Sequence, residues 1–197
     1  MPDFEIMKEQ VKLAYTLTLE GNEIHEPLKN TLLKFMFLFN VFEARLFQTE
    51  NPLTNKPDKT PTSDRLLEIC NNLKSEREWF QVKDYDKYGK FFVKRYIDQD
   101  GNYDDRNLFR QRTPLVREKV KKAIVKLANE EYDDDLFYSY LEIAYRFRNN
   151  LFHGGKDTIY LSQYIECFDM VSWLIHKLLS DMVKKRFIGL VEKYPRP

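Results

Sequence analysis

Residues 26–48, EPLKNTLLKFMFLFNVFEARLFQ, decide the fold class of this chain. Apolar side chains recur here every three or four positions, which is the spacing of a helix that turns one face to a core. The stripe consists of Leu28, Leu32, Phe35, Phe39, Phe42 and Leu46, widened by Met36, Phe37 and Phe47. We therefore predict a long helix that ends before Asn51-Pro52, and we expect it to be the central helix of the fold.

Four further stretches show helical periodicity, and a weaker one covers residues 4–20. They lie at about 64–80, at about 115–130 after Thr113-Pro114, from the Asp133–Asp135 run to His153, and at about 158–188. Thr before Pro suits an N-cap and first helical position, and acidic residues stabilise a helix start. The segment 81–112 is ambiguous, because Asp100-Gly101 between aromatic runs suits either a hairpin or a helix followed by a loop.

These patterns predict an all-α protein, a helical bundle of five or six helices with an irregular insertion around 81–112. The chain shows no internal repeat, so we expect one domain over 1–197 with its core at about 26–190. Hydrophobic residues make up 43% and aromatic residues 15% of the sequence, which is ample for a core. The net charge of +1 excludes a global basic field of the kind that draws proteins to nucleic acid.

The sequence predicts a soluble, cytoplasmic protein. Its first residues lack the basic flank and apolar stretch of a secretion signal. The most apolar run, Phe35 to Phe42, is far too short to span a bilayer, so we expect no membrane contact. The two cysteines, Cys70 and Cys167, lie on helical segments far apart in sequence and are interpreted as reduced structural thiols.

One short run carries chemistry: Arg148-Asn149-Asn150-Leu151-Phe152-His153-Gly154, at the predicted end of a helix. Arginine offers a planar fork of donors to phosphate oxygens, and histidine exchanges a proton near neutral pH. That pairing suits work on a phosphodiester. A purely structural interpretation also stands, in which Arg148 forms an internal salt bridge, His153 caps the helix and Gly154 supplies the left-handed turn after it.

The position of Arg148 indicates that it needs a partner. It falls on the buried stripe of its helix, seven residues after Leu141 and four after Ala144, and burying an unpaired guanidinium is costly. The helix over 26–48 places Asn40 and Glu43 on one face, so Glu43 is the natural partner. Pairing of Glu43 with Arg45 or Arg146 remains an alternative.

Positive charge is unevenly distributed along the chain. Residues 83–126 contain thirteen Lys and Arg against seven acids, whereas 127–145 contain six acids and no base. Cations interleaved with aromatics suit a surface that follows RNA phosphates, although a solvated helix face with ion pairs explains the same pattern. The predicted RNA-binding residues are Lys119, Lys122, Lys126, Arg146 and Lys156.

The sequence contains none of the motifs that we looked for as signs of other kinds of catalytic or binding site. The chain has no P-loop, no Rossmann glycine pattern and no His-Glu-x-x-His. With only three histidines, His25, His153 and His176, a His-rich metal site is not expected, and we predict neither a metal nor another cofactor.

The run from Arg148 to Gly154 resembles the Arg-Asn-x-x-x-His signature of the HEPN superfamily, compact helical domains that are often metal-independent ribonucleases. The resemblance implies a catalytic pair, Arg148 and His153, with Asn149 adjacent and Glu43 in support. Asn40 and Asn150 are the further supporting residues. It also implies a homodimer in which two copies of the pair line one composite active site.

The resemblance implies cleavage of RNA by its own 2′-hydroxyl, in a defence or toxin-type role with an antitoxin or defence-system partner. The subgroup paired with minimal nucleotidyltransferases carries His-x-Tyr, whereas Gly154 and Gly155 follow His153 here. The chain is therefore more similar to HEPN proteins of phage-defence and abortive-infection systems. Two alternatives stay open: a non-catalytic HEPN module for dimerisation or for nucleotide or RNA binding, and a helical adaptor for a neighbouring enzyme.

Overall fold

The described part of the chain is all-α, as predicted. The computed structural model describes residues 26–46, 66–68, 70–71, 81–105, 108–109, 113–132, 135–153 and 161–184. Over these residues it contains α-helices and short 3-10 helices and no strand. In chain order they are α2 (Glu26–Leu46), η1 (Val82–Tyr85), α4 (Asp86–Tyr96), α5 (Pro114–Ala128), α6 (Leu136–His153), η2 (Ser162–Tyr164) and α8 (Ile165–Lys184).

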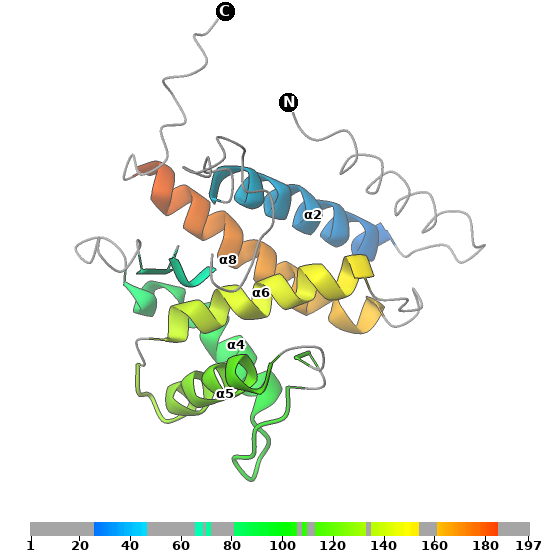
Figure 1. The fold of residues 1–197 in the computed structure, drawn as a ribbon. Helices are drawn as coiled ribbons and strands as arrows, with labels where there is room; N and C mark the ends of the chain where they lie inside the picture. The colour runs from blue at the N-terminus through cyan, green and yellow to red at the C-terminus, as the bar shows by residue number, and fades with distance from the viewer. Residues whose placement is uncertain are drawn as a thin grey trace, which may run out of the picture.

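The central helix is α6, not α2 as the sequence suggested. Every residue from Leu136 to Phe147 is buried, including the polar side chains of Ser139, Glu142 and Arg146. In Figure 1, α6 runs between the pair formed by α2 and α8 and the pair formed by α4 and α5. A helix covered on all sides shows no polar face, so periodicity alone did not single it out.

Helix α2 is amphipathic and packs against α8. Its buried stripe contains the predicted residues from Leu28 to Phe42, and Phe35 meets Phe168 of α8 edge to face at 5.0 Å between ring centroids. Met36 widens the stripe as predicted, whereas Phe37 is 68% exposed. Phe37 follows Phe35 by two positions, about 200° around the helix, and therefore lies on the outer side.

The segment 81–112 is more regular than the predicted irregular insertion. Helix α4 occupies its first half and buries Tyr88, Phe92 and Tyr96 in the main core. A tight turn follows, closed by a single bridge between Ile97 and Tyr103. The structure thus favours the helix-plus-loop alternative, since one bridge is no hairpin. Gly101 has a positive φ of 80° in this turn, which only glycine adopts without strain.

The other helices predicted from the sequence are found wherever the structure describes the residues concerned. Thr113 is the N-cap of α5 and Pro114 its first residue, although the Thr113 side chain makes no capping hydrogen bond. Leu66 and Cys70 are buried in short helical pieces of the predicted 64–80 helix. Cys70 and Cys167 are both buried in the core and take part in no disulfide. The predicted segment 4–20 lies outside the described residues.

Candidate functional site

The side chains of Arg148 and Glu43 meet at the boundary between α6 and α2. Arg148 donates a hydrogen bond from Nη2 to Glu43 Oε2 at 3.2 Å, and its Nε lies 3.2 Å from Glu43 Oε1. The two side chains retain 21% and 14% of their exposure, respectively. The predicted partner of Arg148 is confirmed, and residues 105 positions apart in sequence are joined by a charge-assisted contact.

Burial and the attraction of Arg148 have opposite effects on the ionisation of Glu43. Burial raises the pKa of the Glu43 carboxyl, while the charge of Arg148 and its hydrogen bond pull that pKa down, and burial prevails. Desolvation of an ion pair can outweigh its Coulomb attraction, so the direction is physically reasonable. What the pair provides is therefore a guanidinium held in one pose with part of its surface still accessible.

Two neighbours on α6 complete the cluster. Arg148 donates from Nη1 to Asn149 Oδ1 at 3.3 Å, and Asn149 is hydrogen-bonded to Tyr145 one turn earlier. Burial raises the pKa of the Tyr145 phenol, against the hydrogen bond with Asn149 and the charge of Arg148, which lower it. From the sequence alone Tyr145 was interpreted as a packing residue, although its spacing of four residues from Asn149 was a usable signal for this contact.

His153 is the last helical residue of α6, so the run from Arg148 to His153 is helical as expected. Five residues correspond to a rise of about 7.5 Å and a rotation of about 140° around the axis. One copy of α6 therefore does not place positions 148 and 153 on the same face. The side chain of His153, together with Gly154 and Lys156, lies outside what the structure describes.

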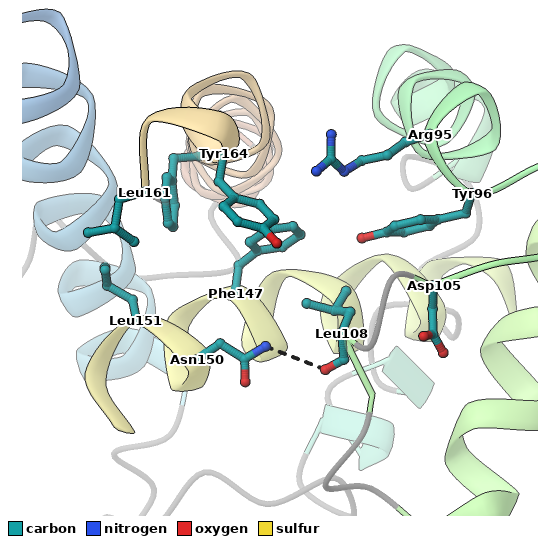
Figure 2. A pocket seen from close by; sticks show the side chains of 10 residues that line it. Arg95, Tyr96, Asp105, Leu108, Phe147, Asn150, Leu151, Leu161 and Tyr164 are labelled. Atoms are coloured by element: carbon teal, nitrogen blue, oxygen red, sulfur yellow. Dashed lines mark hydrogen bonds between the residues drawn. The ribbon is translucent and has the colours of Figure 1, made fainter. Parts of the chain in front are cut away.

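The supporting asparagines lie in different places. Asn40 is half-buried on α2, one turn before Glu43, as predicted. Asn150 follows Arg148 by about 200° of helix rotation and lies on the opposite side of α6. There its amide donates to the Leu108 carbonyl at 3.4 Å and lines a pocket shown in Figure 2. Asn150 is therefore not part of the Arg148 cluster.

Two of the predicted RNA-binding cations, Arg146 and Lys119, do not contribute to an accessible surface around Arg148. Arg146 is only 8% exposed and pairs with the buried Glu142 at 3.5 Å, which contradicts its assignment as an RNA-contacting residue. Lys119 binds Asp135 at 3.1 Å at the start of α6, roughly 20 Å of helix from Arg148. Lys122 and Lys126 are exposed on α5.

Comparison with protein-family models, with curated proteins and with solved structures found no match to this chain. Among the described residues, no group of three or more His, Cys, Asp or Glu is placed to hold a metal ion. No helix in the described ranges is both long and apolar enough to cross a membrane.

Proposed function

We propose that this protein is a metal-independent endoribonuclease of the HEPN type, acting in a defence or toxin role. The observation that carries the proposal is the Arg148–Glu43 pair, which holds a guanidinium at the end of a fully packed helix within one and a half turns of a histidine. A guanidinium so placed can receive the negative charge that develops on a phosphoryl group.

The proposed reaction is an intramolecular transesterification of RNA. The 2′-oxygen attacks the adjacent phosphorus and loses its proton, the bond from phosphorus to the 5′-oxygen breaks, and that oxygen gains a proton. The products are a 2′,3′-cyclic phosphate and a 5′-hydroxyl. His153 serves one of the two proton transfers, a role that typically contributes roughly 10²–10⁴-fold in rate. Arg148 stabilises the charge on the non-bridging oxygens.

The register of α6 supports a composite site. Positions 148 and 153 are about 140° apart around one helix. A second copy of the chain, related by a two-fold axis near the end of α6, would bring its position 153 towards this chain's Arg148. A homodimer is therefore part of the proposal, and an antitoxin or other defence-system protein would act on that dimer.

The test is cleavage of single-stranded RNA by the purified protein in EDTA. We expect cyclic-phosphate products, and losses of at least 10²-fold for His153→Ala and for Arg148→Ala. His176→Ala is the matched control, because His176 is an exposed histidine on α8 outside the cluster. Cleavage that vanishes in EDTA and returns with magnesium would refute the metal-independent scheme. Toxicity in cells that survives both substitutions would refute the nuclease.

The second candidate function is a non-catalytic module. It is supported by the Arg148–Glu43 pair if that pair has a structural role. Arg148 and Glu43 join α6 to α2, so they can hold a dimerisation surface without any chemistry. Measuring the oligomeric state of both variants separates the two candidates. Loss of cleavage with the dimer intact supports the enzyme, whereas loss of the dimer in a protein that never cleaves RNA supports the module.

A further inference from the structure

A pocket lies on the side of α6 opposite Arg148, between the ends of α4 and α6 and the start of α8. Its walls are apolar and are formed by Phe147, Leu151, Leu161 and Phe168. Arg95, Tyr96 and Tyr164 form its polar rim, and Figure 2 shows their guanidinium and hydroxyl groups directed into one gap. Apolar walls with a few convergent polar groups are typical of ligand sites.

Tyr96 contributes a hydroxyl group to the lining of this pocket. The residue as a whole is only 2% exposed, it lines the pocket, and Figure 2 draws no hydrogen bond from its hydroxyl to another lining residue. By contrast, the equally buried Tyr88 donates its hydroxyl proton to the Tyr140 carbonyl at 3.0 Å. The Tyr96 hydroxyl, which can donate and accept, is therefore available to a group that enters through the pocket mouth.

The rim of the pocket is positively charged. The Arg95 guanidinium carbon lies 5.4 Å from the centre of the Tyr164 ring, so the cation and the ring form one platform. Asp105 also lines the pocket, but Arg117 binds its carboxylate at 2.7 and 3.3 Å through two nitrogens. Lys94, the residue before Arg95, is exposed and adds a further cation nearby.

The size of the pocket limits what can enter. The enclosed space is about 20 Å³, room for roughly one water molecule, and it widens to about 430 Å³ when the open mouth is included. An exocyclic group or the edge of a ring therefore fits inside, while the ring itself stays at the mouth beside Tyr164. Unpaired bases in RNA are recognised by such stacking on aromatic or guanidinium planes, with hydrogen bonds to the base edge.

We propose that this pocket binds one unpaired nucleobase of a single-stranded RNA, with the edge of the base on the Tyr96 hydroxyl and the adjoining phosphate on Arg95. The inference rests on the proposed function for the identity of the ligand. It adds a recognition site on the opposite side of the same helix end, since Asn150 of the pocket lies two residues after Arg148. The RNA would thus span both sides of α6.

The test measures binding separately from cleavage. A His153→Ala chain is titrated into a fluorescein-labelled, single-stranded 12-nucleotide RNA, and the Kd is obtained from anisotropy at several salt concentrations. Tyr96→Phe removes one hydroxyl and is expected to raise Kd about fivefold. Arg95→Gln is expected to reduce the slope of log K against log salt by about 0.7, the value for one phosphate contact on a single strand.

Two matched controls come from the same region. Tyr103→Phe likewise removes one tyrosine hydroxyl, here a buried one without a hydrogen-bond partner among the described residues, but Tyr103 does not line the pocket. Lys90→Gln removes one cation from α4 on the side where Lys90 pairs with Asp86 at 3.2 Å. Both controls are expected to bind like the parent chain.

The outcomes separate this inference from the proposed function. If Tyr96→Phe and Arg95→Gln bind like their controls, or if duplex RNA binds as tightly as the single strand, the pocket assignment is wrong even when the parent protein cleaves RNA. If binding depends on Tyr96 and Arg95 while the parent protein never cleaves RNA, the pocket assignment stands and the nuclease proposal falls.

Discussion

Breaking the Arg148–Glu43 pair should destabilise the fold by an amount that lies between surface and core values. Exposed ion pairs contribute about 0–1 kcal/mol, and removing one partner of a buried pair costs about 3–5 kcal/mol. Here the side chains are 21% and 14% exposed, and burial outweighs attraction in setting the Glu43 pKa. We therefore expect Glu43→Ala to lower the free energy of unfolding by about 2 kcal/mol, or about 4–8 °C in Tm for a chain of this length.

Urea unfolding followed by circular dichroism, at one fixed protein concentration, measures this cost. A double-mutant cycle with Glu43→Ala and Arg148→Ala should give a coupling energy of about 1 kcal/mol. The Lys34–Asp169 pair is the internal control: its atoms are 3.8 Å apart and its side chains are 56% and 50% exposed. The same cycle there should give at most about 0.5 kcal/mol. Equal coupling at the two sites would refute the view that Glu43 fixes the pose of Arg148.

Three further predictions follow from the same packing. Gly89→Ala should cost about 3 kcal/mol or more in urea unfolding, since a Cβ there would lie 2.0 Å from Tyr140 Oη, and adding Tyr140→Phe should recover part of that loss. Because burial raises the pKa of Glu43 in the fold, its ionised form stabilises the fold less than its protonated form does, and the unfolding free energy rises as pH falls towards 4.5. Wild type should therefore gain stability relative to Glu43→Gln between pH 7 and pH 5, and an unchanged difference would contradict this sign. Arg117→Ala should lower the unfolding free energy by about 1–2 kcal/mol, because it removes the contact of a half-exposed guanidinium with the fully buried Asp105, and no measurable loss in the same assay would argue against the pair.

Helical periodicity was sufficient to predict the elements that keep one polar face. The stripes of α2, α5 and α8 each alternate buried and exposed positions, so the ranges of α2 and α5 were predicted to within two residues, whereas α8 begins later and ends earlier than the predicted 158–188. Helix α6 was predicted, but its central position in the bundle was not. A helix that is buried on every side has no single apolar stripe that would indicate which way it faces. The structure of the 81–112 segment could not be decided from its sequence. Tyr88, Phe92 and Tyr96 have helical spacing, but the nearby Asp-Gly pair also suits a hairpin.

The sequence predicted the part of the candidate site in which a buried charge needs a partner of opposite charge. A guanidinium on a buried stripe needs an anion, and Glu43 was the acidic residue on the apolar surface of a core helix, so the pair could be inferred across 105 residues. The prediction that Arg146 binds RNA was wrong, because the charge of a sequence segment does not show whether a side chain in it is buried. Four residues before it, Glu142 is itself buried and engages it within the helix, a contact that sequence spacing allows but does not require.

The packing of α6 has a consequence for how the two sites would work together. Arg148 and Asn150 belong to the same helical turn and face opposite ways, one towards Glu43 and the other towards the pocket. Since α6 is covered on all sides up to Phe147, this turn cannot rotate without disturbing the core. The two side chains therefore keep a fixed spacing. An RNA bound in the pocket would be held at a set distance from Arg148, so substitutions at Tyr96 should alter which phosphodiester is cleaved as well as how tightly RNA binds. Mapping cleavage positions with Tyr96→Phe beside Tyr103→Phe tests this, and identical positions in both variants would show that the two sides of the helix act independently.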